Sequence, residues 1–157
     1  PPEVLSLMTR AAFALTKRGY VLRSGHAIGA DSAFERGASR DAQIFLPVAG
    51  WRGSASSLHP EALGAELWRR ARDIAAAHHP AFTGLSAFVQ ALHTRNVFQV
   101  LGPSLECPSE FVLCWTADGE ASGGTGQALR IAATYGVPVY NLQRSRERAH
   151  VERHLVL

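Results

Sequence analysis

The chain has 157 residues, of which 46% are hydrophobic and 18% are charged, a balance typical of one folded domain and not of a disordered chain. Its apolar runs are shorter than the roughly 20 residues that a membrane helix needs, so we expect no membrane partner. A formal net charge of +3 permits nucleic acid as a partner without requiring it. Two cysteines are too few for a disulfide framework and favour a reduced, cytoplasmic protein.

The first part of the chain alternates helical and extended patterns. Apolar residues recur at helical spacing from Val4 to Leu15, and Gly19 follows as a stop signal. The next patterns predict a strand, a glycine-rich turn, a helix and a second strand over residues 20–23, 24–31, 30–38 and 43–47. This alternation is typical of a parallel sheet with helices on its faces.

The middle of the chain is predominantly helical. Pro60 is suited to open a helix that continues to about Ala77, and a second helical stretch runs from Phe82 to about His93. We interpret residues 58–94 as a helical insertion packed on the edge of the sheet. The apolar residues that follow Arg95 and Asn96 predict a strand that begins at this pair.

The last part returns to alternation, with a strand, a glycine-rich loop, a helix and a strand over residues 111–115, 117–126, 127–135 and 137–142. Residues 143–157 form a basic C-terminal segment. We therefore predict a single α/β domain over residues 1–157, a Rossmann-like doubly wound and mostly parallel sheet. Such domains open with a strand, whereas this chain opens with a helix, so we expect a first strand to precede Pro1.

The first glycine-rich loop contains Ser24, Gly25, His26, Gly29 and Asp31 and lies between a predicted strand and a predicted helix. Free backbone N–H groups and the helix dipole favour an anion at such a place, and glycine lets the backbone approach it closely. Asp31 is suited either to cap the helix or to bind a ribose hydroxyl, and His26 either to donate to a phosphate or to serve as an acid.

The second loop also joins a predicted strand to a predicted helix, and its candidate phosphate-binding residues are Ser122, Gly123, Gly124, Thr125 and Gly126. In a parallel sheet, two such loops open on the same edge, so one ligand could touch both. Neither loop is a phosphate-binding Walker A motif or a G-x-G-x-x-G dinucleotide motif.

The pattern Ser24-Gly25-x-Ala27-x-Gly29-x-Asp31 resembles the S-G-x-A-x-G-x-D signature of the DNA-processing protein A family. Residues 122–139 are similar to the second loop, helix and strand of that family, which belongs to the lysine-decarboxylase-like (SLOG) Rossmann superfamily. The chain looks most like small stand-alone members, often phage-encoded, that are predicted to bind nucleotides. The resemblance implies a Rossmann-like fold and a nucleotide ligand.

Two positions depart from the pattern of these relatives. A histidine usually follows the aspartate of the DNA-processing family by four residues, whereas this chain has Glu35 there. The phosphoribohydrolases of the superfamily have a catalytic glutamate after the second loop, whereas this chain has Gln127 and Arg130 in that region. The resemblance therefore favours binding of a nucleotide over its cleavage.

Further candidates follow from position in the predicted sheet. Arg95 and Asn96 reach the ligand edge if their strand is central, and Trp115 and Thr116 end the strand before the second loop, where they could contact a base. Asp31 and Glu110 are the candidate catalytic acids if the protein is an enzyme. His150 and His154 share one helical face without an evident third ligand, so we expect no metal site.

The sequence predicts a protein that binds a nucleotide, a nucleotide derivative or nucleic-acid phosphates through the two glycine loops. A mediator that binds single-stranded DNA and an enzyme that hydrolyses a nucleotide N-glycosidic bond are the alternatives. Because the expected acid is missing, we predict no efficient turnover of nucleoside monophosphates. No cofactor is expected, and a homo-oligomer is left open.

Overall fold

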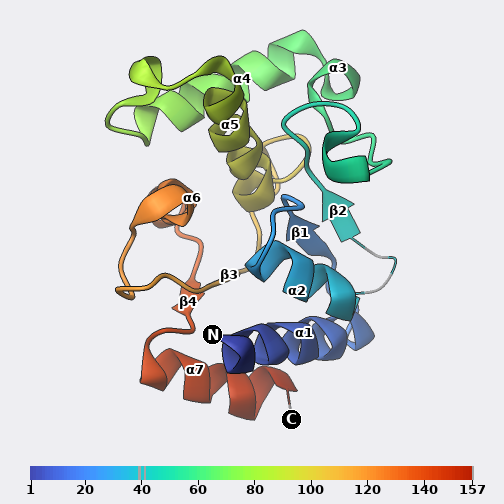
Figure 1. Cartoon of the computed structure of the whole chain (residues 1–157), viewed down its shortest axis with the longest axis vertical. Helices are drawn as coiled ribbons and strands as arrows, with labels where there is room; N and C mark the ends of the chain where they lie inside the picture. Colours follow the sequence, from blue (N-terminus) through green and yellow to red (C-terminus); the bar gives the residue numbers. More distant parts are fainter. Residues whose placement is uncertain (39, 41, 157) are drawn as a thin grey trace.

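The computed structural model describes residues 1–38, 40 and 42–156, and these form a mixed α/β protein with short parallel strands (Figure 1). The helices are α1 (Pro2–Lys17), α2 (Ala30–Ala38), α3 (Pro60–Leu63), α4 (Ala65–Ala77), α5 (Ala87–Leu101), α6 (Gly123–Thr134) and α7 (Ser145–Val151). Short 3₁₀ turns lie at Trp51–Gly53 and Phe82–Gly84, and a π-helical turn at Glu152–Val156 extends α7. The strands lie between an upper group of helices, α3 to α5, and a lower group that includes α1 and α7.

The four strands form two parallel pairs. The strand β1 (Leu22–Ser24) pairs with β2 (Ala42–Ile44), and β3 (Val112–Cys114) pairs with β4 (Val139–Asn141). The amino ends of β1 and β3 are neighbours, because the rings of Tyr20 and Phe111 lie 5.7 Å apart between centroids.

Two hydrophobic clusters cover opposite faces of the strands. Val112 and Val139 pack with the cluster that contains α4, α5 and α6, whereas their chain neighbours Leu113 and Tyr140 pack with the cluster of α1 and α2. Adjacent strand residues point to opposite faces, so this alternation places helices on both sides. The α/β class and the parallel strands predicted from the sequence are confirmed.

The helices α1 and α2 approach closely where small residues meet. The Thr9 hydroxyl donates to the Ala33 carbonyl at 2.9 Å, and a Cβ atom at Gly37 would overlap the Thr9 carbonyl oxygen and crowd Ala12. Glycine at position 37 is thus required by space and not by backbone conformation.

The helices predicted over residues 4–15 and 30–38 and the four strand positions are confirmed within a few residues, whereas α7 lies in the basic C-terminal segment, for which no helix was predicted. Four further predictions are wrong. The helix from Pro60 breaks at Gly64, where φ is 93°, and the next helix runs to Leu101 instead of ending at His93. Arg95 and Asn96 consequently lie inside α5 and do not begin a strand. The helix predicted over residues 127–135, α6, begins at Gly123, so most of the second glycine run is its first turn.

No helix among the described residues is long and apolar enough to cross a membrane.

Replacing Gly37 with alanine tests the close approach of α1 and α2. Alanine is the better helix former by about 1 kcal/mol, yet its methyl group must push the helices apart at a cost of up to about 3 kcal/mol, so we expect a net loss of about 1–2 kcal/mol in the free energy of unfolding. Urea denaturation measures the difference. Gly84→Ala is the matched control, because a Cβ there has nothing within 4 Å. A Gly37→Ala protein as stable as the wild type would show that the helices have room.

Candidate functional site

The first glycine loop holds a carboxylate between a serine and a histidine. The buried Ser24 hydroxyl, at the end of β1, donates to Glu35 Oε1 at 2.5 Å, and His26 Nδ1 lies 2.7 Å from Glu35 Oε2. His26 has a φ of 59°, in the left-handed region that few non-glycine residues occupy. Glu35 therefore orients the imidazole by its Nδ1 atom, and Nε2 has no hydrogen-bond partner among the described residues.

Asp31 lies in the first turn of α2 and caps the loop. Its Oδ2 accepts a hydrogen bond from the Ala27 backbone N–H at 3.0 Å. Burial raises the pKa of the Asp31 carboxyl above its ordinary value, and the negative charge of Glu35 raises it further, whereas the Ala27 N–H and the Arg95 charge oppose that rise. Asp31 therefore binds the backbone of the loop that precedes α2 instead of capping the N–H groups of the helix, in surroundings that disfavour its charge.

Arg95 of α5 reaches down to the same loop. Its side chain is only 7% exposed, donates through Nη1 to the Gly25 carbonyl and lies over the Trp51 ring, 5.3 Å from the centroid. Burial lowers the pKa of Arg95, and the charges of Asp31 and Glu35 oppose that shift. A Cβ atom at Gly25 would overlap the guanidinium, so glycine is required for Arg95 to pack here.

Asn96, next to Arg95 on α5, faces α6 instead. Asn96 Nδ2 donates to Gln127 Oε1 at 3.3 Å, and His93 Nδ1 lies 3.1 Å from the same oxygen. Gln127 is fully buried and donates in turn to the Ala75 carbonyl at 3.1 Å. This network joins α4, α5 and α6, so the structure gives Asn96 a role in packing and separates it from the first loop.

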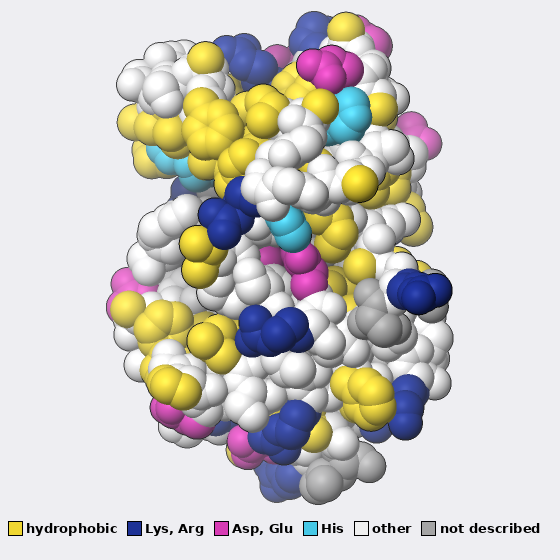
Figure 2. All heavy atoms as spheres, turned by 45° about the vertical axis from the view of Figure 1, so that its right-hand side comes forward, with side chains coloured by type: hydrophobic (Ala, Val, Ile, Leu, Met, Phe, Trp, Pro, Cys, Tyr) yellow, Lys and Arg dark blue, Asp and Glu magenta, His cyan; other side chains and the backbone are white. Residues whose placement is uncertain are grey.

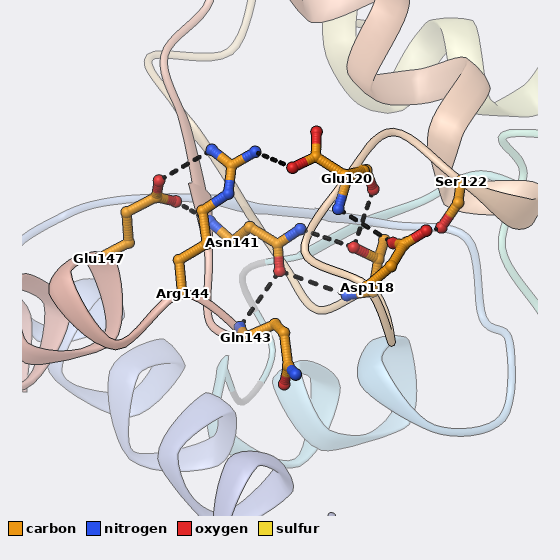
Figure 3. Close-up of polar contacts among 8 residues, drawn as sticks. Asp118, Glu120, Ser122, Asn141, Gln143, Arg144 and Glu147 are labelled. Atoms are coloured by element: carbon orange, nitrogen blue, oxygen red, sulfur yellow. Dashed lines mark hydrogen bonds and ion pairs between the residues drawn. The ribbon is translucent and has the colours of Figure 1, made fainter.

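The second glycine loop is held by its own polar groups (Figure 3). Asp118 Oδ1 accepts from the Ser122 hydroxyl at 2.7 Å and from the Glu120 backbone N–H at 3.0 Å. These two hydrogen bonds, the backbone one first, lower the pKa of the Asp118 carboxyl. The buried Thr116 hydroxyl donates to the Glu120 carbonyl at 2.8 Å and accepts from Asn141 Nδ2 at 2.7 Å.

The same loop is fastened to the segment that follows β4. Arg144 bridges Glu120 at 3.4 Å and Glu147 at 3.1 Å, and Glu147 also accepts from the Asn141 backbone N–H (Figure 3). Trp115 Nε1 donates to Gln143 Oε1 at 2.9 Å. Ser122, Thr116 and Trp115 are thus engaged in contacts within the protein.

The part of the second loop that faces solvent is the start of α6. Gly123, Gly124 and Thr125 are exposed in the first turn of this 12-residue helix, where backbone N–H groups lack carbonyl partners within the helix. Gly126 is buried, and a Cβ atom there would overlap the Ala121 carbonyl. A helix start with exposed N–H groups and no Cβ at two positions attracts an anion.

The structure brings Ser24, Gly25, His26, Asp31 and Arg95 together around one loop. Glu110 is exposed and precedes the amino end of β3, whereas the glycine loops follow the carboxyl ends of β1 and β3. Sequence reasoning did not find Glu35 as the partner of His26. The spacing is a usable signal, because Asp31 and Glu35 are four residues apart and share one face of α2.

Figure 2 shows a histidine side chain directly above an acidic one, where the drawn surface narrows between its upper and lower parts. No group of three or more His, Cys, Asp or Glu residues in the described part of the chain could hold a metal ion. Comparison of the chain with protein-family models, curated proteins and solved structures finds no match. The function is therefore inferred from the side chains and their arrangement.

The pKa of Asp31 is raised and that of Asp118 is lowered, so replacing each with asparagine should have opposite effects on stability at pH 7. Because folding raises the pKa of Asp31, the folded protein binds a proton more tightly, and stability falls as pH rises above about 3.8 through the folded pKa. Asp31→Asn removes this loss, so we expect the variant to exceed the wild type in stability at pH 7 and to lose that advantage below pH 4. Urea denaturation from pH 3 to 8 measures it.

Asp118→Asn is the matched comparison. Folding lowers the pKa of Asp118, so its charge stabilises the folded protein above its ordinary value of 3.8, and the variant should be less stable than the wild type at pH 7. Parallel pH profiles for wild type and Asp31→Asn would contradict the stated environment of Asp31.

Proposed function

We propose that the chain is a Rossmann-like domain with strand order β2-β1-β3-β4 that binds a nucleotide or nucleotide derivative. Two features support the order. The amino ends of β1 and β3 are neighbours, and the crossover helices α2 and α6 pack in different clusters, on opposite faces of the strands. Parallel crossovers are almost always right-handed, so helices on opposite faces carry the chain in opposite directions along the sheet.

With that order, the chain reverses direction between β1 and β3. Ligands of open α/β sheets bind in the crevice beyond the carboxyl ends of the strands at such a switch point. The observation on which the proposal rests is that each of these two strands leads through a glycine-bearing loop into a helix. The two loops then face the same crevice and are available to one ligand.

The two loops suit different parts of that ligand. The first loop presents the carboxylates of Asp31 and Glu35 with the buried Arg95 as their counterion, which disfavours a phosphate and favours donors such as ribose hydroxyls. The exposed start of α6 at Gly123 and Gly124 favours a phosphate. We therefore assign the sugar to the first loop and the phosphate to the second.

A thermal-shift panel tests the proposal with adenosine, AMP, ADP and the corresponding guanosine and cytidine compounds. A ligand present at 100 times its dissociation constant adds about 2.7 kcal/mol of stability, which raises Tm by about 5–10 °C in a chain of this size. Phosphate-bearing compounds should give the larger shifts. In Gly124→Val, phosphate-bearing compounds should raise Tm no more than the nucleoside does, because the valine side chain would cover the exposed N–H groups at the start of α6.

Gly84→Val is the matched control, since both glycines have open space around a Cβ atom and a φ that other residues adopt. Ligand shifts that survive in Gly124→Val, with the unliganded Tm unchanged, would remove the second loop from the site. The absence of any shift across the panel would reject the nucleotide proposal.

Cleavage of the bound nucleotide is a second candidate function, favoured by the His26–Glu35 contact. Hydrolysis of an N-glycosidic bond forms a bond from water to the sugar carbon and breaks the carbon–nitrogen bond, whose electron pair stays on the base. The protonated Nε2 of His26 would supply the proton that the base needs to leave. Asp31, in the same loop, would accept the proton released by water.

Incubating the protein with nucleoside monophosphates and measuring free base by chromatography tests this candidate. We expect any base release to fall at least about 100-fold in His26→Asn, since general acid catalysis contributes about 10²–10⁴-fold. Asparagine is the chosen replacement because it tolerates a positive φ. No base release by the wild type, or release equal in His26→Asn, would leave binding as the function.

A further inference from the structure

A basic groove lies on the outer side of α1 and α2, away from the glycine loops. It encloses about 610 Å³, and its lining includes Arg10, Phe13 and Lys17 of α1, Arg18 directly after α1, and Arg36 of α2. The first four recur at positions i, i+3, i+7 and i+8, the spacing of one helical face, while the buried face of α1 carries its apolar residues. We call this surface the α1–α2 groove.

The charges of the groove are not neutralised by the described residues. None of its four cations forms an ion pair with a described carboxylate. Arg18 donates to the His154 carbonyl at 2.9 Å, a contact that leaves its positive charge uncompensated. The neighbouring acid on α2, Glu35, is turned toward His26 and Ser24. Basic side chains recur over the lower part of the face drawn in Figure 2.

An exposed aromatic ring lies among these cations. Phe13 is 54% exposed, and Lys17 Nζ lies 4.4 Å from the centroid of its ring. The ring is therefore accessible beside the cations, where it can stack with a flat ring of a ligand.

We propose that the α1–α2 groove binds single-stranded nucleic acid. Such a strand carries one negative charge and one flat ring per nucleotide, which is the combination that four cations around an exposed aromatic ring match. Arginine provides three of the four cations and pairs with phosphate oxygens in a two-pronged geometry. Residues 10 to 18 extend along about 12 Å of helix, so the groove contacts several successive phosphates.

Two other polyanionic partners fit less well. An acidic peptide supplies charge without a ring for every charge, and so leaves Phe13 uncovered. An anionic membrane surface meets a protein over a flat or protruding apolar face, whereas this surface is concave with one exposed aromatic residue among its named members. Both remain outcomes of the experiment below.

Fluorescence anisotropy with fluorescein-labelled dT20 and the full chain, from 50 to 200 mM salt, tests the proposal. Contacts to four phosphates predict that log affinity falls by about 2.8 per log unit of salt. The double variant Arg10→Gln/Arg36→Gln should reduce that slope by about 1.4. Phe13→Leu keeps an apolar side chain but removes the stacking surface, and should weaken binding about 5- to 150-fold.

Arg69→Gln/Arg70→Gln on α4 is the control, since it removes the same charge from another face and should leave dT20 affinity unchanged. Equal losses in this control and the groove variant, or no binding of dT20 at 50 mM salt, would overturn the proposal. So would binding of polyglutamate, or of phosphatidylserine vesicles, as tightly as dT20 and through the same residues.

The experiment is independent of the nucleotide site. Gly124→Val should bind dT20 like the wild type, and the groove variants should keep the thermal shift given by AMP. Loss of dT20 binding in Gly124→Val would instead place nucleic acid at the glycine loops and reject the groove.

Discussion

The buried guanidinium of Arg95 is the constraint on which the site depends. A charge this deep is tolerated only with partners, and Arg95 has the Gly25 carbonyl, the face of Trp51 and the nearby carboxylates of Asp31 and Glu35. These partners come from three parts of the chain: the first loop, α2 and the turn at Trp51. Each partner offsets part of the cost of burying this charge, and together they tie the first glycine loop, α2 and the Trp51 turn to α5.

The same arrangement brings the carboxylates of Asp31 and Glu35 close together, which is unfavourable for the stability of the protein. Burial and the charge of Glu35 both raise the pKa of Asp31, so folding makes its charged form less favourable than it is in water. His26 is held in a left-handed conformation that is uncommon for its residue type. Groups kept in unfavourable states at the carboxyl end of a strand are typical of sites that bind or react with a ligand. A simple helix cap needs neither the second carboxylate nor the histidine.

The sequence predicted most elements because their signals are local. The helix α1 has a regular apolar face, and α2 was predicted with the observed bounds because a glycine turn precedes it. The helix α5 was misjudged because it is buried on several sides, and a buried helix has the same continuous apolar run as a buried strand. As a result, Arg95 was predicted at the start of a strand instead of inside a helix. Its partner loop lies 70 positions earlier in the chain, and only tertiary packing brings the two together.

The positions of the basic side chains also depend partly on local sequence and partly on tertiary packing. In the dense basic run near the C-terminus, Arg144 pairs with Glu120 and Glu147, while Arg148 and Arg153 donate to backbone carbonyls. The cations of the α1–α2 groove, which form no ion pair with a described carboxylate, are spread over two helices and form no run in the sequence. The groove exists because α1 and α2 meet at Thr9 and Gly37, where small atoms allow the two helices to approach.

The nine-residue helix α2 consequently joins the two surfaces. It begins at the first loop, where the Asp31 side chain accepts from Ala27, and its last turn contains Arg36 and Gly37 at the groove. The Thr9–Ala33 hydrogen bond and the contact at Gly37 hold it against α1, while Glu35 holds it to Ser24 and His26. Because α2 is fastened at both ends, a ligand at the loop and a strand in the groove meet surfaces at a fixed separation. The geometry therefore favours two independent sites over one site that rearranges.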